Sequence, residues 1–323
     1  MTLDFPALLT IIVTLFLLMA CGFFARKKHI IDDVASKRLS TLIVKIGQPM
    51  MIISALIEAD VSLDNLKDGA MIVAVGIVLH ALMAVMAFFL CKGFRNLDER
   101  KITEFSLVFT NAGFIGFPIM EALFGAPGLF LASFYVISFH LFLWSWGIAI
   151  LARKRSDIKL TVRKIFINLG SVPCLIGVVV YVLMLLVPGF AVPAFASKFL
   201  MYLSNLCTPI SVLITGALLA TRTPKQIFGS GKIYYFSAMK LIGIPLVVCL
   251  VGKVLCLAFN FPADIVLFAT VEAALPAAAT ITMFAEMYDL DAGYASQTVG
   301  TSSLLSVGTL PIVILIAKLI LGL

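Results

Sequence analysis

The stretch FTNAGFIGFPIMEALFG, residues 109–125, interrupts an otherwise apolar part of the chain. The segment around it, 103–124, is long enough to cross a bilayer as a helix, for which about 20 residues suffice. It nevertheless contains five residues that weaken helices or are costly in lipid: Asn111, Gly113, Gly116, Pro118 and Glu121. Because proline removes a backbone donor and clashes with the preceding turn, we predict a helix that is broken near the bilayer midplane.

The composition of the whole chain indicates a membrane protein. Of the 323 residues, 62% are hydrophobic and 13% are charged, and the mean hydropathy is +1.12. A soluble chain of this length could not bury so much apolar surface. We therefore predict an all-α polytopic membrane protein.

Ten apolar segments have the length of a membrane span. Their approximate bounds are 6–25, 37–57, 69–91, 103–124, 129–152, 167–187, 195–221, 233–255, 264–287 and 293–321. The N-terminus, MTLDFP, lacks the basic start of a signal peptide, so we expect the first segment to remain as a helix.

The charge distribution predicts the orientation of the chain. The net charge is +7, but most of the 24 lysines and arginines lie in four short clusters between apolar segments, within 26–38, 92–101, 153–164 and 222–232. This pattern indicates cytoplasmic loops rather than a nucleic-acid surface. We predict a multi-pass protein of the cell (plasma or inner) membrane with both termini outside the cytoplasm.

The two halves of the chain show a repeated pattern. Pro49 and Pro209, and likewise Pro118 and Pro276, lie nearly the same distance apart along the chain. Because five spans per half is an odd number, the second half must run upside-down relative to the first. We predict a first repeat over 1–152, a cytoplasmic basic linker over 153–166 and an inverted second repeat over 167–323.

In this arrangement the broken fourth and ninth segments would cross at the midplane. Each second half-helix would begin there with free N–H groups and a partial positive charge, which together favour an anion. Asn111 and Thr280 could add neutral hydrogen bonds beside Gly113, Gly116 and Pro118, and beside Pro276 and Ala277. The alternative is a pair of kinked helices whose small residues allow close packing.

These motifs resemble those of the auxin efflux carrier family, which includes bacterial malate and malonate permeases and plant auxin exporters. The resemblance covers nearly the whole chain and rests on the stretch quoted above and on AALPAAATITMFAEMYDLDAGYASQTVGTSSLLSVGTLP, residues 273–311. It implies a ten-helix fold similar to that of sodium/proton antiporters. Segments 1, 2, 6 and 7 would form a scaffold, often dimeric, and segments 3–5 and 8–10 a transport unit that moves like an elevator.

The resemblance also implies which residues hold the substrate. Family members use the asparagine of segment four, here Asn111, and residues around the proline of segment two, here Gln48 and Pro49. A polar position in segment five corresponds to His140, where plant relatives tend to carry glutamine. Unlike glutamine, a histidine at this position can bind and release a proton. The resemblance therefore does not predict which substrate this protein carries.

Buried ionisable residues are candidates for coupling. Glu272 lies well inside segment nine, where it could bind a proton or remain a permanently protonated or paired acid. His80 and His140 could titrate near neutral pH or simply bond a backbone carbonyl. Glu121 could be a ligand or a residue that reaches water, and we expect Lys240 and Lys45 to extend to the cytoplasmic side.

The sequence therefore predicts a secondary active transporter of a small organic anion, such as malate, malonate or an auxin-like acid, with a proton rather than sodium as coupling ion. The expected partners are the anion, the lipid bilayer and a second copy bound through the scaffold. No nucleotide-binding loop, CxxC, HExxH or GxSxG motif occurs, so we expect no cofactor, no metal and no catalysis. A channel or a transporter-like sensor is the alternative, followed by an intramembrane enzyme.

Overall fold

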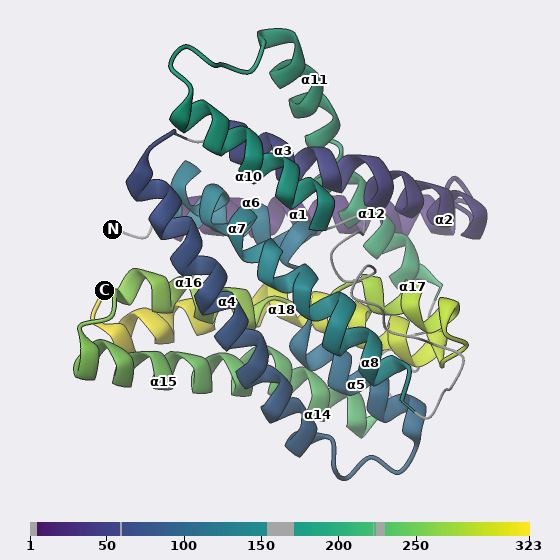
Figure 1. Ribbon diagram of the computed structural model, residues 1–323. Helices are drawn as coiled ribbons and strands as arrows, with labels where there is room; N and C mark the ends of the chain where they lie inside the picture. Colours follow the sequence, from purple (N-terminus) through teal and green to yellow (C-terminus); the bar gives the residue numbers. More distant parts are fainter. Residues whose placement is uncertain (1–4, 59, 154–170, 222, 224–229) are drawn as a thin grey trace.

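The described part of the computed structural model, residues 5–58, 60–153, 171–221, 223 and 230–323, is all-helical (Figure 1). Apart from one isolated bridge between Thr110 and Ala277, its regular elements are helices. Their bounds are α1 (Phe5–Lys27), α2 (Asp33–Leu42), η1 (Ile43–Gly47), α3 (Gln48–Ile57), α4 (Leu63–Leu90), α5 (Leu97–Val108), η2 (Ala112–Gly116), α6 (Phe117–Phe124), α7 (Ala126–Phe142), η3 (Leu143–Gly147), α8 (Ile148–Leu151), α10 (Ser171–Leu186), α11 (Ala194–Ser204), α12 (Cys207–Ala220), α14 (Gly231–Ala238), η4 (Met239–Gly243), α15 (Ile244–Phe259), α16 (Ala263–Ala274), α17 (Thr280–Met287) and α18 (Ala292–Leu321).

Within the described residues, six helical stretches are long and apolar enough to cross a membrane. They are Asp33–Ile57, Leu63–Leu90, Ala126–Leu151, Ala194–Ala220, Gly231–Phe259 and Ala292–Leu321. This confirms an all-α multi-pass membrane protein. The ten-span inverted repeat and its crossed helices stay predictions, and the basic linker, apart from Arg153, lies outside the described residues.

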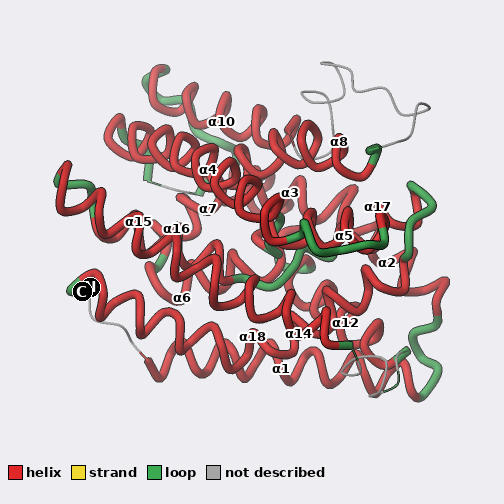
Figure 2. Tube along the Cα trace, turned by 90° about the horizontal axis from the view of Figure 1, so that it is seen from below, coloured by secondary structure: helices red, strands yellow, loops and turns green. Residues whose placement is uncertain are grey.

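Several helices pack closely in pairs. The helix α1 packs against α12, α3 against α10 and α11, α4 against α7, and α16 against α15 and α18. Figure 1 shows α4 and α7 running side by side, and Figure 2 shows α1 and α18 lying along one edge of the molecule. The helices α1 and α12 meet almost backbone to backbone, since a Cβ atom at Gly22 or Gly216 would overlap a carbonyl group of the facing helix.

Four π-helical segments, η1 to η4, widen the helices, and three of them end in the same motif. Ile-Gly-x-Pro occurs at 46–49, 115–118 and 242–245. The proline lacks an N–H and its ring displaces the carbonyl four residues earlier, which opens the turn. The residue before each proline then donates its N–H to the carbonyl five residues back, as Ile244 does to Met239.

At the end of the molecule where α5 begins, a buried carboxylate joins two helices. Glu104 of α5 has no exposed surface, and its oxygens lie 2.7 Å from Arg100 Nε and 2.7 Å from Arg153 Nη2. Close by, Glu99 pairs with Lys232 near the surface. The Glu104 pairs connect α5 to the turn after α8.

Replacing Glu104 by Gln should destabilise the protein measurably. The change leaves two half-buried guanidinium groups without their counter-charge, and we expect a loss of about 2 kcal/mol, seen as a lower midpoint of thermal unfolding in detergent. Glu99→Gln is the control and should cost less than about 1 kcal/mol, because its pair with Lys232 is more exposed. Equal midpoints for the two variants would contradict this assignment.

Candidate functional site

Two interrupted helices are joined where each of them breaks. The first break separates α5 from η2 and α6, and the second separates α16 from α17. The Asn111 N–H donates to Pro276 O at 2.8 Å, and the Ala278 N–H donates to Phe109 O at 2.9 Å. These two bonds form the short antiparallel bridge, which we call the joint (residues 109–111 and 275–279).

A serine of α18 completes the joint. The Ala277 N–H donates to Ser302 Oγ at 3.1 Å, so this amide is not free to hold an anion, contrary to what the sequence suggests for Ala277. The first helical bonds after each break run from Ile115 to Asn111 O and from Ile281 to Ala278 O. The amides just before them, including those of Gly113 and Thr280, are the N-terminal groups that a ligand could bind.

Glycines let side chains approach the first break closely. A Cβ atom at Gly113 would lie 3.1 Å from Gln48 Nε2, so the amide of Gln48, at the start of α3, faces the joint. A Cβ atom at Gly116 would lie 3.6 Å from Glu272 Oε1. Asn111, Gln48 and Glu272 therefore gather around the same short segment, and Asn111 itself is buried.

The expected position of Lys240 is wrong. This lysine does not extend to the cytoplasmic side; it has no exposed surface, and its Nζ donates to Leu107 O at 3.0 Å. Glu272 is also fully buried, interacts electrostatically with Lys240, and has no hydrogen-bond partner for either oxygen among the described residues. The place of Lys240 near one end of its segment suggested that it reaches the membrane surface. The π-helical turn η4 and the packing around it instead direct its side chain inward.

The two candidate histidines are buried in different surroundings. His80 lies among aromatic rings, stacked on Tyr135 and Phe142 with centroids 5.3 Å apart, and its Nδ1 is 2.6 Å from Gly76 O. His140 lies beside Phe139, and neither ring nitrogen has a hydrogen-bond partner in the described structure. His80 is thus bonded as a structural histidine would be, whereas His140 keeps two unbonded nitrogens.

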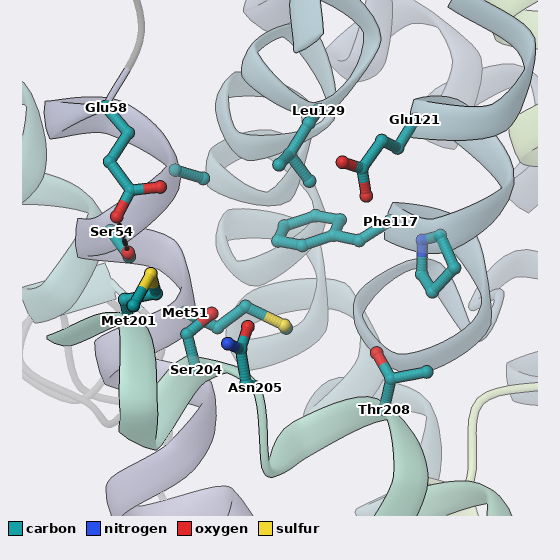
Figure 3. A pocket seen from close by; sticks show the side chains of 12 residues that line it. Met51, Ser54, Glu58, Phe117, Glu121, Leu129, Met201, Ser204, Asn205 and Thr208 are labelled. Atoms are coloured by element: carbon teal, nitrogen blue, oxygen red, sulfur yellow. Dashed lines mark hydrogen bonds between the residues drawn. The ribbon is translucent and has the colours of Figure 1, made fainter. Parts of the chain in front are cut away.

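A cavity of about 390 Å³ is lined by residues of α3, α6, α7, α11 and α12 (Figure 3). Figure 3 shows Glu58, directly after α3, and Glu121 of α6 on opposite sides of it, with Phe117 and Leu129 between them. The Glu58 carboxylate accepts a hydrogen bond from Ser54 at 2.8 Å. Pro118 also lines this cavity, whereas Pro49 is buried within α3.

Two polar residues that bond at or beside the joint were not predicted from the sequence. No role was predicted for Ser302, and Lys240 was expected to extend to the cytoplasmic side. The Ile-Gly-x-Pro motif at 242–245 is a signal that could have marked Lys240, because π-helical turns occur frequently at functional sites.

Removing the hydroxyl of Ser302 should weaken the joint. In Ser302→Ala the buried Ala277 N–H loses its acceptor, which we expect to cost about 1–3 kcal/mol in thermal unfolding. The matched control is Ser303→Ala, since the buried Ser303 Oγ has no hydrogen-bond partner among the described residues. If both variants unfold at the same temperature, the Ala277–Ser302 bond contributes nothing to stability.

Comparisons with known proteins identify the family. Residues 7–314 match the model of a family described as membrane transport protein, which is that of the auxin efflux carriers. A protein of Methanothermobacter thermautotrophicus named uncharacterized transporter is 23% identical over 304 residues, which cover 93% of this chain and 95% of the relative. An uncharacterized transporter of Methanocaldococcus jannaschii is 23% identical over 288 residues, 87% of this chain and 89% of its own. The chain belongs to the membrane transport protein family of auxin efflux carriers.

Proposed function

We propose that this protein is a secondary active transporter of a small organic anion, a carboxylate such as malate or malonate or an auxin-like acid. The observation that carries the proposal is the joint, where two helices stop and restart inside the protein. The partial positive ends of η2–α6 and α17 begin there, next to the amide side chains of Asn111 and Gln48. Such a site can hold a carboxylate without a basic side chain.

The proposal includes a ten-span inverted repeat with crossed fourth and ninth spans that moves by an elevator mechanism. In this proposal α1, α3, α10, α11 and α12 correspond to the scaffold, and α4 to α8 and α14 to α18 to the transport unit; the close packing of α1 on α12, of α3 on α10 and α11, and of α4 on α7 is in keeping with it. A homodimer through the scaffold helices and termini outside the cytoplasm of the cell membrane belong to the same proposal.

The proposed substrate site consists of Asn111, Gly113, Gly116, Gln48 and Thr280, with Pro118, Pro276, Pro49, Ala277 and His140 shaping its surroundings. Proton coupling is assigned to Glu272, Glu121 and His80. Glu272 supports this assignment best, because it is fully buried next to Gly116 and its oxygens are unbonded within the described residues. The coupling ion is a proton rather than sodium.

Proteoliposome transport tests the site directly. Saturable uptake and counterflow of one member of a panel of mono- and dicarboxylates are expected for the wild type. Asn111→Ala and Glu272→Gln should each lower the rate by about 100-fold or more, since each removes a buried polar partner of the transported species. Asn65→Ala is the control, because the Asn65 side-chain amide donates to the Asp60 carbonyl at an exposed position, and the bond from its backbone N–H to Ser62 Oγ does not depend on the side chain.

Normal transport by both site variants would refute the site. Flux that neither saturates nor shows counterflow would instead indicate a channel.

The cavity predicts an electrostatic effect on substrate entry. Glu58 lines the cavity together with Phe117 and Pro118, which directly follow η2, and we propose this cavity as the path of entry. A carboxylate about 10 Å from an anion raises the energy of the anion by about 0.4 kcal/mol in water. Glu58→Gln should therefore lower KM about twofold at low ionic strength, and the difference should vanish in about 0.5 M salt. Asp64→Asn, at an exposed position paired with Lys67, should leave KM unchanged; an unchanged KM in Glu58→Gln would contradict this path of entry.

A further inference from the structure

We propose that Lys240 is a built-in cation: its ammonium group occupies, between the carbonyl end of α5 and the Glu272 carboxylate, the position that a bound sodium ion would take in a cation-coupled carrier. The inference deepens the proposed transport function and rests on it. It gives a physical reason for transport without sodium, and it assigns Lys240 a positioning role at the joint.

The backbone around Lys240 directs it to this place. Lys240 is the second residue of η4, the widened turn before Pro245, and among the described lysines and arginines it alone has no exposed surface. Its Nζ donates to Leu107 O at 3.0 Å. Leu107 lies in the last turn of α5, where the break leaves carbonyl groups without helical partners.

The joint gathers negative charge that requires a cation. The helices α5 and α16 both end there, each with a partial negative charge at its C-terminus. Glu272, two residues before the end of α16, adds a carboxylate whose charge acts on the Lys240 ammonium without a direct bond, since neither Glu272 oxygen has a hydrogen-bond partner among the described residues. A buried ammonium is costly unless it is paired and bonded, so the lysine and its surroundings stabilise each other.

The groups that face Lys240 are also the groups that bind metal cations. Backbone carbonyls of a broken helix together with a carboxylate are typical ligands of sodium in membrane carriers. An ammonium presents one positive charge and hydrogen-bond donors to the same oxygens. Removing the side chain beyond Cβ would leave these oxygens facing a space that a small cation can enter.

The test is to remove the ammonium and supply a cation from solution. Lys240→Ala is purified in detergent, and its thermal unfolding is measured in sodium chloride, ethylammonium chloride and choline chloride at equal ionic strength. We expect a lower midpoint than wild type in choline, and a rise of about 3 °C or more in about 0.1 M sodium or ethylammonium. Choline is too large to enter, and the wild-type midpoint should not depend on the cation.

Lys45→Ala is the matched control. Lys45 lies in η1, just before the first Ile-Gly-x-Pro motif, but its side chain is exposed, so the variant should show no cation dependence. In proteoliposomes, sodium or ethylammonium should also restore counterflow to Lys240→Ala. A Lys240→Ala protein whose unfolding and transport are indifferent to the cation would overturn the proposal.

A double variant, Lys240→Met with Glu272→Gln, covers the case in which Lys240→Ala does not fold. It removes both charges together, so we expect it to fold and to be insensitive to the cation. Failure of the double variant to fold would show that Lys240 acts by packing, against the proposal. If wild-type liposomes transport no anion, the proposed function fails, while the unfolding midpoints still report on Lys240.

Discussion

Everything in this structure depends on one constraint: backbone groups exposed by a break inside a membrane must be satisfied by the protein itself. Each unsatisfied group would cost several kcal/mol in lipid. Here the two breaks satisfy each other through the bonds from Asn111 N–H to Pro276 O and from Ala278 N–H to Phe109 O. Neither broken helix would be stable at its observed place without the other, so they must pack together.

The same constraint accounts for the polar residues around the joint. Two mutual bonds leave further amides and carbonyls, and the chain supplies Ser302 for the Ala277 amide and Lys240 for the Leu107 carbonyl. Glu272 then lies opposite Lys240 in a region without water-exposed surface. The amides that start the second half-helices have no such partner in the two mutual bonds, and in the proposed transporter they are the groups that would bind the anion.

The sequence predicted the breaks but not what surrounds them. Pro276 lies at the second break, where proline acts on its own backbone. Pro118 lies seven residues after Asn111, in α6 behind the widened turn η2, so the first break falls in the predicted segment but not at the predicted proline. The partners of the freed groups come from distant parts of the chain, so spacing could not reveal that Ser302 and Lys240 bond at the joint. The inward direction of Lys240 depends on a widened turn and its neighbours, and a count of turns from the membrane surface therefore misplaced it.

The distribution of bonds also bears on how such a site could move. The bonds Asn111–Pro276, Ala277–Ser302, Lys240–Leu107 and Thr103–Tyr294 all connect helices assigned to the transport unit. Gln48, by contrast, belongs to α3 of the proposed scaffold, and its side-chain amide lies close to Gly113, just after the first break. The proposed elevator motion would therefore move the joint as one body, because its own polar groups would stay satisfied while the surface that faces the proposed scaffold changes.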